Sequence, residues 1–177
     1  MFDVGATPAG DAAHFRDGHA WLRQAGTEEE LFARADVRLP GEHLALDLLA
    51  AATAARLAGA TAEAIRSAVG DFRGAEHTLE LVAEDEGVRY FNDSKATNVA
   101  AASKSLEAFD RPVIAIMGGR FKGGDLSSLA RIAASRARRV LLIGEARPLF
   151  VAAFRGLVAY EECPSLEAAV TRARAVA

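Results

Sequence analysis

The stretch VIAIMGGRFKGGDLSSLARIAASRARRVLLI, residues 113–143, decides the fold. It begins with an apolar run, 113–117, passes through a glycine-rich loop, 118–124, and a helical segment, 126–137, and ends in a second apolar run, 140–143. Continuous apolar strands on either side of a helix are typical of parallel strands covered on both faces. The stretch therefore predicts an open, mostly parallel, three-layer α/β sheet.

The alternation of strands and helices continues on both sides of this stretch. We expect a hairpin of strands at 79–82 and 88–91, a helix from about Lys95 to Phe109, a helix at 148–154, a short strand at 157–160 and a last helix from 166. Upstream the pattern differs, with a hairpin over 14–22, helices at 44–57 and 62–72, and the acidic run Glu28–Glu30, expected to be a solvated loop. We predict two parts, residues 1–74 and 75–177.

Composition limits the class of protein. The 177 residues are 51% hydrophobic and 25% charged, which is a globular composition. A net charge of -3 argues against nucleic acid or an anionic membrane as partner. The most apolar stretch, residues 44–60, contains charges and is shorter than the roughly 20 residues of a bilayer helix. With Cys163 as the only cysteine and no secretory signal, we expect a cytoplasmic protein.

One candidate anion site follows Phe91. Ligands of open parallel sheets bind beyond the carboxyl ends of the strands. Residues 92–98, NDSKATN, would end a strand and begin a helix, whose free backbone N–H groups attract anions. Lys95 adds a full charge, and Thr97, expected in the first turn, adds a hydroxyl donor. A helix cap formed by Asp93 or Ser94 is the simpler alternative, but it does not explain the lysine and the threonine together.

A second candidate anion site is the glycine-rich loop at 118–124. Its glycines let the backbone approach a ligand, and Arg120 and Lys122 supply positive charge. Asp125 follows the last glycine, so the loop is not a Walker phosphate loop. A plain connection to the next helix, with Asp125 as its N-cap, remains the alternative. Since no histidines or cysteines are spaced like a metal site, we expect no protein-held metal in this chain.

Four elements, in this order along the chain, resemble those of the Mur ligase family. They are Gly41-Glu42-His43 before an alanine-rich helix, Phe72-Arg73-Gly74 followed by His77, the NDSKATN segment at 92–98, and Gly118-Gly119 with Lys122. Each element alone is weak, but the combination is specific and runs over nearly the whole chain.

The resemblance, which is strongest to the D-glutamate-adding branch, implies part of an ATP-dependent ligase of bacterial peptidoglycan synthesis. In that reaction ATP phosphorylates the carboxylate of UDP-N-acetylmuramoyl-L-alanine, and the amine of D-glutamate attacks the acyl phosphate. Residues 1–74 would end the central ATP-binding domain, and 75–177 would form a Rossmann-like C-terminal domain without its last strand and helix. The phosphate loop and the ligands of Mg²⁺ would lie upstream in the missing N-terminal and central domains, so the chain alone is expected to be inactive.

The resemblance also implies roles for single residues. Lys95 would lie close to the reacting groups, as the catalytic residue, and Thr97 and Lys122 would bind a carboxylate of D-glutamate, with Ser94 beside them in the motif. On the nucleotide side, the resemblance places Asp93 against the ribose. It also places His77, Asn92 and Asp47 on that side.

The chain departs from the family pattern at three positions on the ATP side. Leu44 and Asp47 stand where asparagines are usual, and Thr78 replaces an arginine. Two alternatives therefore stay open. One is another Mur or folylpolyglutamate-synthase-type ligase, and the other is a noncatalytic nucleotide- or anion-binding module, which Leu44 and Thr78 favour.

Overall fold

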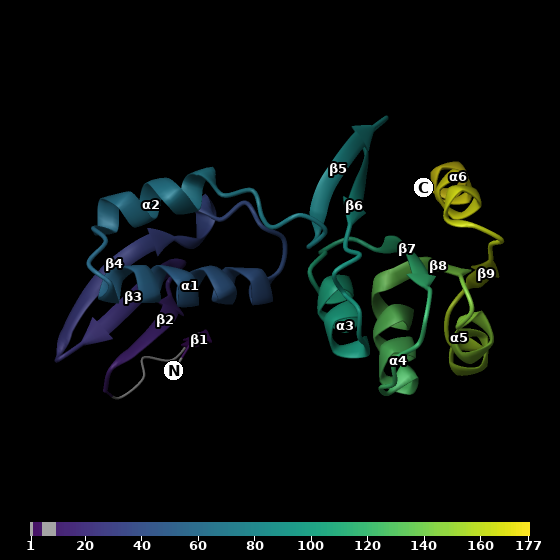
Figure 1. Ribbon diagram of the computed structural model, residues 1–177, viewed down its shortest axis with the longest axis horizontal. Helices are drawn as coiled ribbons and strands as arrows, with labels where there is room; N and C mark the ends of the chain where they lie inside the picture. Colours follow the sequence, from purple (N-terminus) through teal and green to yellow (C-terminus); the bar gives the residue numbers. More distant parts are fainter. Residues whose placement is uncertain (1, 5–9) are drawn as a thin grey trace. The chain divides into compact units, whose positions relative to one another are not determined.

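The computed structural model describes residues 2–4 and 10–177. Contacts between Cα atoms separate two compact units, Met1–Ala75 and Glu76–Ala177. Figure 1 shows the first unit in purple and blue and the second in teal, green and yellow. In the described part of the chain no helix is long and apolar enough to span a membrane.

The first unit is a four-stranded sheet with two helices packed on it. Its strands lie in the order β1 (Phe2–Val4), β2 (Ala12–Arg16), β3 (His19–Gln24), β4 (Thr27–Ala33). The β1–β2 pair is parallel and the other two pairs are antiparallel. A 3₁₀ turn, η1 (Arg34–Asp36), leads to α1 (Glu42–Leu57) and α2 (Ala62–Asp71). Phe15 and Phe32 meet edge to face at 5.9 Å in its core, and Thr61 caps α2.

The prediction that Glu28–Glu30 form a solvated loop is wrong, because these residues lie in β4. The three carboxylates contact basic side chains of other elements. Glu28 contacts Arg16 and Arg23 at 3.0 and 2.9 Å. Glu29 contacts Arg56 at 2.8 Å, and Glu30 contacts His19 at 2.8 Å. These pairs offset the low preference of acidic residues for strands.

The second unit contains the predicted parallel sheet. Its strands lie in the order β7 (Val113–Gly118), β8 (Ala137–Ile143), β9 (Tyr160–Glu162), all parallel. The crossovers are α4 (Leu126–Arg136) and α5 (Arg147–Phe154), and the unit also contains α3 (Val99–Glu107) and α6 (Leu166–Val176). The expected strand at 157–160 is displaced to Tyr160–Glu162.

The three layers follow from the alternation of side chains along β8. Val140 and Leu142 join a buried cluster with residues of α3, α4 and α5 on one face. Leu141 lies on the other face with Cys163 and with Ala169 of α6. The prediction of an open, mostly parallel, three-layer α/β sheet is confirmed for this unit.

The hairpin of the second unit forms a separate sheet. Its strands, β5 (Glu80–Asp85) and β6 (Val88–Asn92), pair antiparallel. Glu86 and Gly87 both have positive φ, 50° and 81°, as a two-residue type I′ turn requires. The candidate site after Phe91 follows from the rule for open parallel sheets, which assumes that this strand belongs to the parallel sheet. That assumption is wrong, because β6 pairs only with β5 among the described strands.

Candidate functional site

The predicted helix start at Lys95 is wrong, since α3 begins at Val99. Asn98 is its N-cap, and the Asn98 side chain accepts a hydrogen bond from the backbone N–H of Ala101 at 2.9 Å. Lys95 and Thr97 therefore lie in a turn before the helix and not in its first turn, and neither Asp93 nor Ser94 caps it. Within this turn the N–H of Ala96 bonds to the carbonyl of Asp93 at 2.9 Å.

The turn is held by the segment that precedes β5. The N–H of Lys95 donates to the carbonyl of His77 at 3.0 Å. The N–H of Leu79 donates to Oδ1 of Asp93 at 3.0 Å, and Nδ2 of Asn92 lies 2.9 Å from Nδ1 of His77. His77 and Leu79 have φ values of 66° and 42°, a strained conformation for residues other than glycine. These hydrogen bonds hold the strained segment and fix the turn at the same time.

The second predicted element is the loop between β7 and α4, residues 118–124, which we call the lysine loop. Its start is fixed to the end of β8, because the N–H of Gly119 donates to the carbonyl of Ile143 at 3.1 Å. Its end is fixed by Asp125, whose Oδ1 accepts from the N–H groups of Ser127 and Ser128 and caps α4. The N-cap at Asp125, expected from the sequence as part of the alternative to an anion site, is therefore present, and Lys122 lies exposed between these two anchors.

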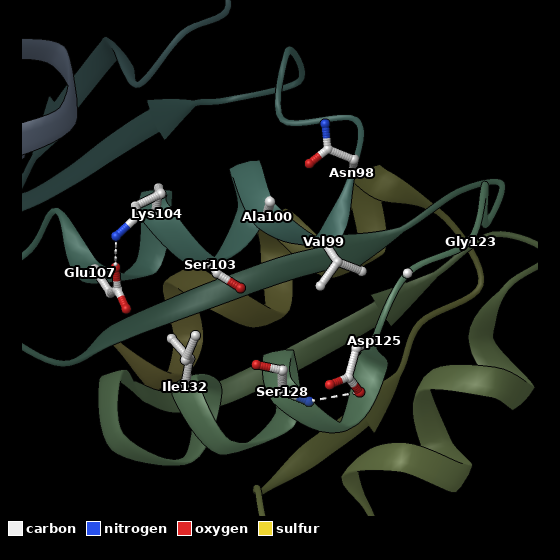
Figure 2. A pocket seen from close by; sticks show the side chains of 11 residues that line it. Asn98, Val99, Ala100, Ser103, Lys104, Glu107, Gly123, Asp125, Ser128 and Ile132 are labelled. Carbon is white, nitrogen blue, oxygen red and sulfur yellow. Dashed lines mark hydrogen bonds and ion pairs between the residues drawn. The ribbon is translucent and has the colours of Figure 1, made fainter.

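The lysine loop meets the start of α3. At Gly124 an added Cβ would lie 2.8 Å from Cγ2 of Val99, so the backbone of the loop packs closely against the Val99 side chain. Asn98 and Gly123 line the same open groove between α3 and α4, of about 600 Å³ (Figure 2). The lysine loop therefore lies beside the NDSKATN turn, although β6 and β7 belong to different sheets.

Both lysines of these two segments are available to an anion. Lys95, Ser94, Thr97 and Lys122 are exposed. Among the described residues neither Lys95 nor Lys122 forms an ion pair, whereas Lys104 pairs with Glu107 at 2.9 Å, as Figure 2 shows. Two ammonium groups and a hydroxyl on adjoining segments suit a ligand with carboxylate or phosphate groups.

The other predicted residues are distributed over both units. Asp47 is exposed on α1 of the first unit. His77 and Asn92 lie in the second unit beside Asp93, as described above. Leu44 is 7% exposed in the core around α1, which explains an apolar residue there. Over residues 2–4 and 10–177 no group of three or more His, Cys, Asp or Glu side chains could hold a metal.

Sequence reasoning did not single out the turn after β8. Glu145 in this turn contacts Arg120 of the lysine loop, with 2.9 Å between Oε1 and Nε. The signal was available, because β8 is a parallel strand and its carboxyl end belongs to the same rim of the sheet as that of β7.

Comparison with known proteins adds a family and several relatives. Residues 79–177 match the family model described as Mur ligase, glutamate ligase domain. The chain is 48% identical to the UDP-N-acetylmuramoylalanine–D-glutamate ligase of Nitratidesulfovibrio vulgaris (strain DP4), over 81% of this chain and 33% of that protein. It is 40% identical to the enzyme of the same name from Chlorobium phaeobacteroides, over 99% of this chain and 39% of that protein.

A solved structure shows the same fold at low sequence identity. The pseudomurein peptide ligase type C of Methanothermus fervidus matches with a TM-score of 0.67 and 14% identity, over 97% of this chain and 38% of that chain. The chain spans about a third of the length of the curated relatives it matches.

Proposed function

The chain belongs to the Mur ligase family, and we propose that it is the part of a D-glutamate-adding ligase that binds the incoming amino acid. In the whole enzyme, ATP transfers its γ-phosphoryl group to the carboxylate of UDP-N-acetylmuramoyl-L-alanine. The amine of D-glutamate then attacks the carbonyl carbon of the acyl phosphate. The C–N bond forms as the C–O bond to phosphate breaks, the nitrogen loses its proton, and the products are the amide, ADP and phosphate. The reaction belongs to peptidoglycan synthesis in the bacterial cytoplasm.

The observation that supports this proposal most is the contact between Gly124 and Val99. It brings the lysine loop to the turn with Lys95 and Thr97. D-Glutamate has two carboxylates and must approach a negatively charged acyl phosphate, so positioned cations are required to offset the repulsion. We assign the carboxylate of D-glutamate to Lys122 and Thr97, with Ser94 beside them, and we place Lys95 close to the reacting groups.

The nucleotide side follows from the hydrogen bonds of the NDSKATN turn. Oδ1 of Asp93 already accepts from Leu79, so we assign Oδ2 to a ribose hydroxyl. Nδ1 of His77 lies 2.9 Å from Nδ2 of Asn92 and 3.5 Å from Oε2 of Glu80, so we assign the other ring nitrogen, Nε2, to the nucleotide side. Asp47 is assigned to the adenine side. As the family resemblance implies, we assign the phosphate loop and the Mg²⁺ ligands to parts of the ligase outside these residues.

The test is phosphate release by a ligase of the relatives' length that contains this sequence. With ATP, Mg²⁺ and UDP-N-acetylmuramoyl-L-alanine present, we expect release only when D-glutamate is added. Release with another amino acid from a panel would assign the chain to a different Mur or folylpolyglutamate-synthase-type ligase. No release with any acceptor would favour a noncatalytic binding module.

The isolated 177-residue chain provides a second test. We expect no phosphate release from it, and weak or undetectable binding of ADP and D-glutamate by isothermal titration. D-Glutamate-dependent turnover by this chain alone would contradict the assignment of the phosphate loop to another part of the enzyme.

A further inference from the structure

The turn after β8, Gly144 to Ala146, contacts the start of the lysine loop and holds it in place. We call this turn the seat of the loop. The N–H of Ala146 donates to the carbonyl of Gly119 at 3.0 Å, next to the bond from Gly119 to Ile143. Gly144 approaches so closely that an added Cβ would lie 2.7 Å from both N and Cα of Gly119. Nonbonded heavy atoms in packed interiors lie about 3.5–4.0 Å apart. Only glycine therefore fits at 144 while the loop keeps its place.

The next two residues of the loop contact the same region. Arg120 pairs with Glu145, but both side chains are largely exposed, so the pair contributes little. Phe121 is partly buried and meets Phe150 of α5 edge to face, with 6.5 Å between ring centroids. Gly119 is thus fixed to the turn after β8 and Phe121 to α5, immediately before Lys122.

The seat itself is rigid. Nε of Arg147 donates to the carbonyl of Gly144 at 3.0 Å, and its Nη1 donates to the carbonyl of Cys163 at 3.3 Å. Ala146 is 3% exposed, and Phe150 belongs to the main buried cluster of the unit. The turn therefore fixes the loop to the core of the sheet.

From these contacts we propose that Gly144 is a positioning residue for Lys122, through its fit against Gly119. This inference rests on the proposed function, in which Lys122 binds a carboxylate of D-glutamate. Displacing the loop moves the ammonium group of Lys122 relative to Thr97 and Lys95, which lie on another segment. The effect is expected on the affinity for D-glutamate more than on the rate of the chemical step.

The test compares Gly144→Ala with Gly156→Ala in a ligase of full length containing this sequence. The two glycines have nearly equal φ, 74° and 77°, so a methyl group strains both backbones alike. At Gly156, however, an added Cβ meets nothing within 4 Å. We expect Gly144→Ala to raise KM for D-glutamate about tenfold or more, the loss expected for one charge-assisted hydrogen bond, with a smaller change in kcat. Gly156→Ala should leave both constants near their wild-type values.

If Gly144→Ala lowers the folded fraction of the ligase, the amide signals of the 177-residue chain test the positioning role instead of the kinetic constants. In the wild-type chain, the amides of Gly119 and Ala146 should be protected from hydrogen exchange. In Gly144→Ala, the amide signals of Lys122 and Gly123 should shift, and in Gly156→Ala they should not.

The outcomes separate the two proposals. A wild-type ligase without D-glutamate-dependent phosphate release would overturn the proposed function, and the amide signals would still decide whether Gly144 holds the loop. An active ligase in which both alanine variants have the same KM for D-glutamate would overturn the positioning role. Unprotected amides at Gly119 and Ala146 would overturn the seat itself.

Discussion

Replacing Gly124 by alanine tests the contact between the lysine loop and α3. Gly124 has a φ of 116°, which costs an L residue about 1–3 kcal/mol. The added Cβ would lie 2.8 Å from Cγ2 and 3.1 Å from Cβ of Val99. Val99 packs against the main cluster of the second unit and cannot move freely, so the overlap costs about another 1–3 kcal/mol. We expect the free energy of unfolding to fall by about 2–6 kcal/mol, the sum of the two costs, measured by urea titration of the amide signals of this unit.

A double-mutant cycle isolates the overlap from the backbone strain. Val99→Ala removes both γ carbons, so the combination of Gly124→Ala with Val99→Ala should cost less than the sum of the single changes. The expected coupling is about 1–2 kcal/mol. Gly123→Ala is the matched control, since Gly123 has a φ of 101° and an added Cβ there meets nothing within 4 Å. Additivity within about 0.5 kcal/mol for the Gly124 cycle would refute the contact that supports the proposed site.

Three further predictions test the site and the core. Lys122→Met should raise KM for D-glutamate about tenfold or more. Because Lys122 is exposed, the free energy of unfolding of the variant should differ from that of the wild type by less than about 0.5 kcal/mol. The pKa of Glu161 is lowered from 4.5 to about 2, first by its hydrogen bond with Arg172 and, against the effect of burial, also by Arg139. The stabilisation from Glu161 is therefore complete above pH 4.5 and lost as the pH falls toward 2. Glu161→Gln should remove this pH dependence of the unfolding free energy. A Glu161 carboxyl carbon signal that titrates near 4.5 would contradict the lowered pKa. Phe154→Ala should lower the unfolding free energy by about 3–5 kcal/mol, because Phe154 is 0% exposed, whereas Leu149→Ala, 50% exposed on the same helix, should cost far less in the same urea titration.

The parallel sheet could be predicted because its signals are local. The strands β7 and β8 contain short apolar runs, and the helix between them has its own start signal, Asp125 before α4. The third strand, β9, is Tyr160-Glu161-Glu162, and it is displaced from its expected position. Such patterns depend only on neighbouring residues and on burial of both faces, so the elements can be predicted without knowledge of the tertiary structure. The same holds for the hairpin turn at Glu86 and Gly87.

The errors arose where distant contacts decide the structure. Asp93, Ser94 and Asn98 are all good N-cap residues, and the sequence cannot rank them. The bond from Lys95 to the carbonyl of His77 holds the earlier residues in a turn, which leaves Asn98 to cap α3. Likewise the strand at Glu28–Glu30 depends on partners such as Arg56, on another element.

For the candidate site too, the local signals could be predicted from the sequence and the distant contacts could not. The residues of NDSKATN and the lysine loop could be selected from their types and spacing, and their roles remain predictions. The contact that joins the two segments, between Gly124 and Val99, could not be selected, because it depends on how α3 packs beside α4. The turn with Gly144 was missed although the rule about strand ends applies to it equally.

The layer beneath α6 contains a cysteine whose reactivity can report how often α6 detaches from the sheet. That layer is thin, and its buried members are Leu141, Cys163 and Ala169. Cys163 is 5% exposed, and it is the only thiol in the sequence. Because Cys163 packs against Ala169 of α6, we expect a thiol reagent to reach its sulfur in molecules whose α6 has lifted away, and the labelling rate is then the intrinsic rate multiplied by the fraction of such molecules. The mass shift of a single adduct, followed over time, thus measures how often this helix detaches, and no engineered probe is needed.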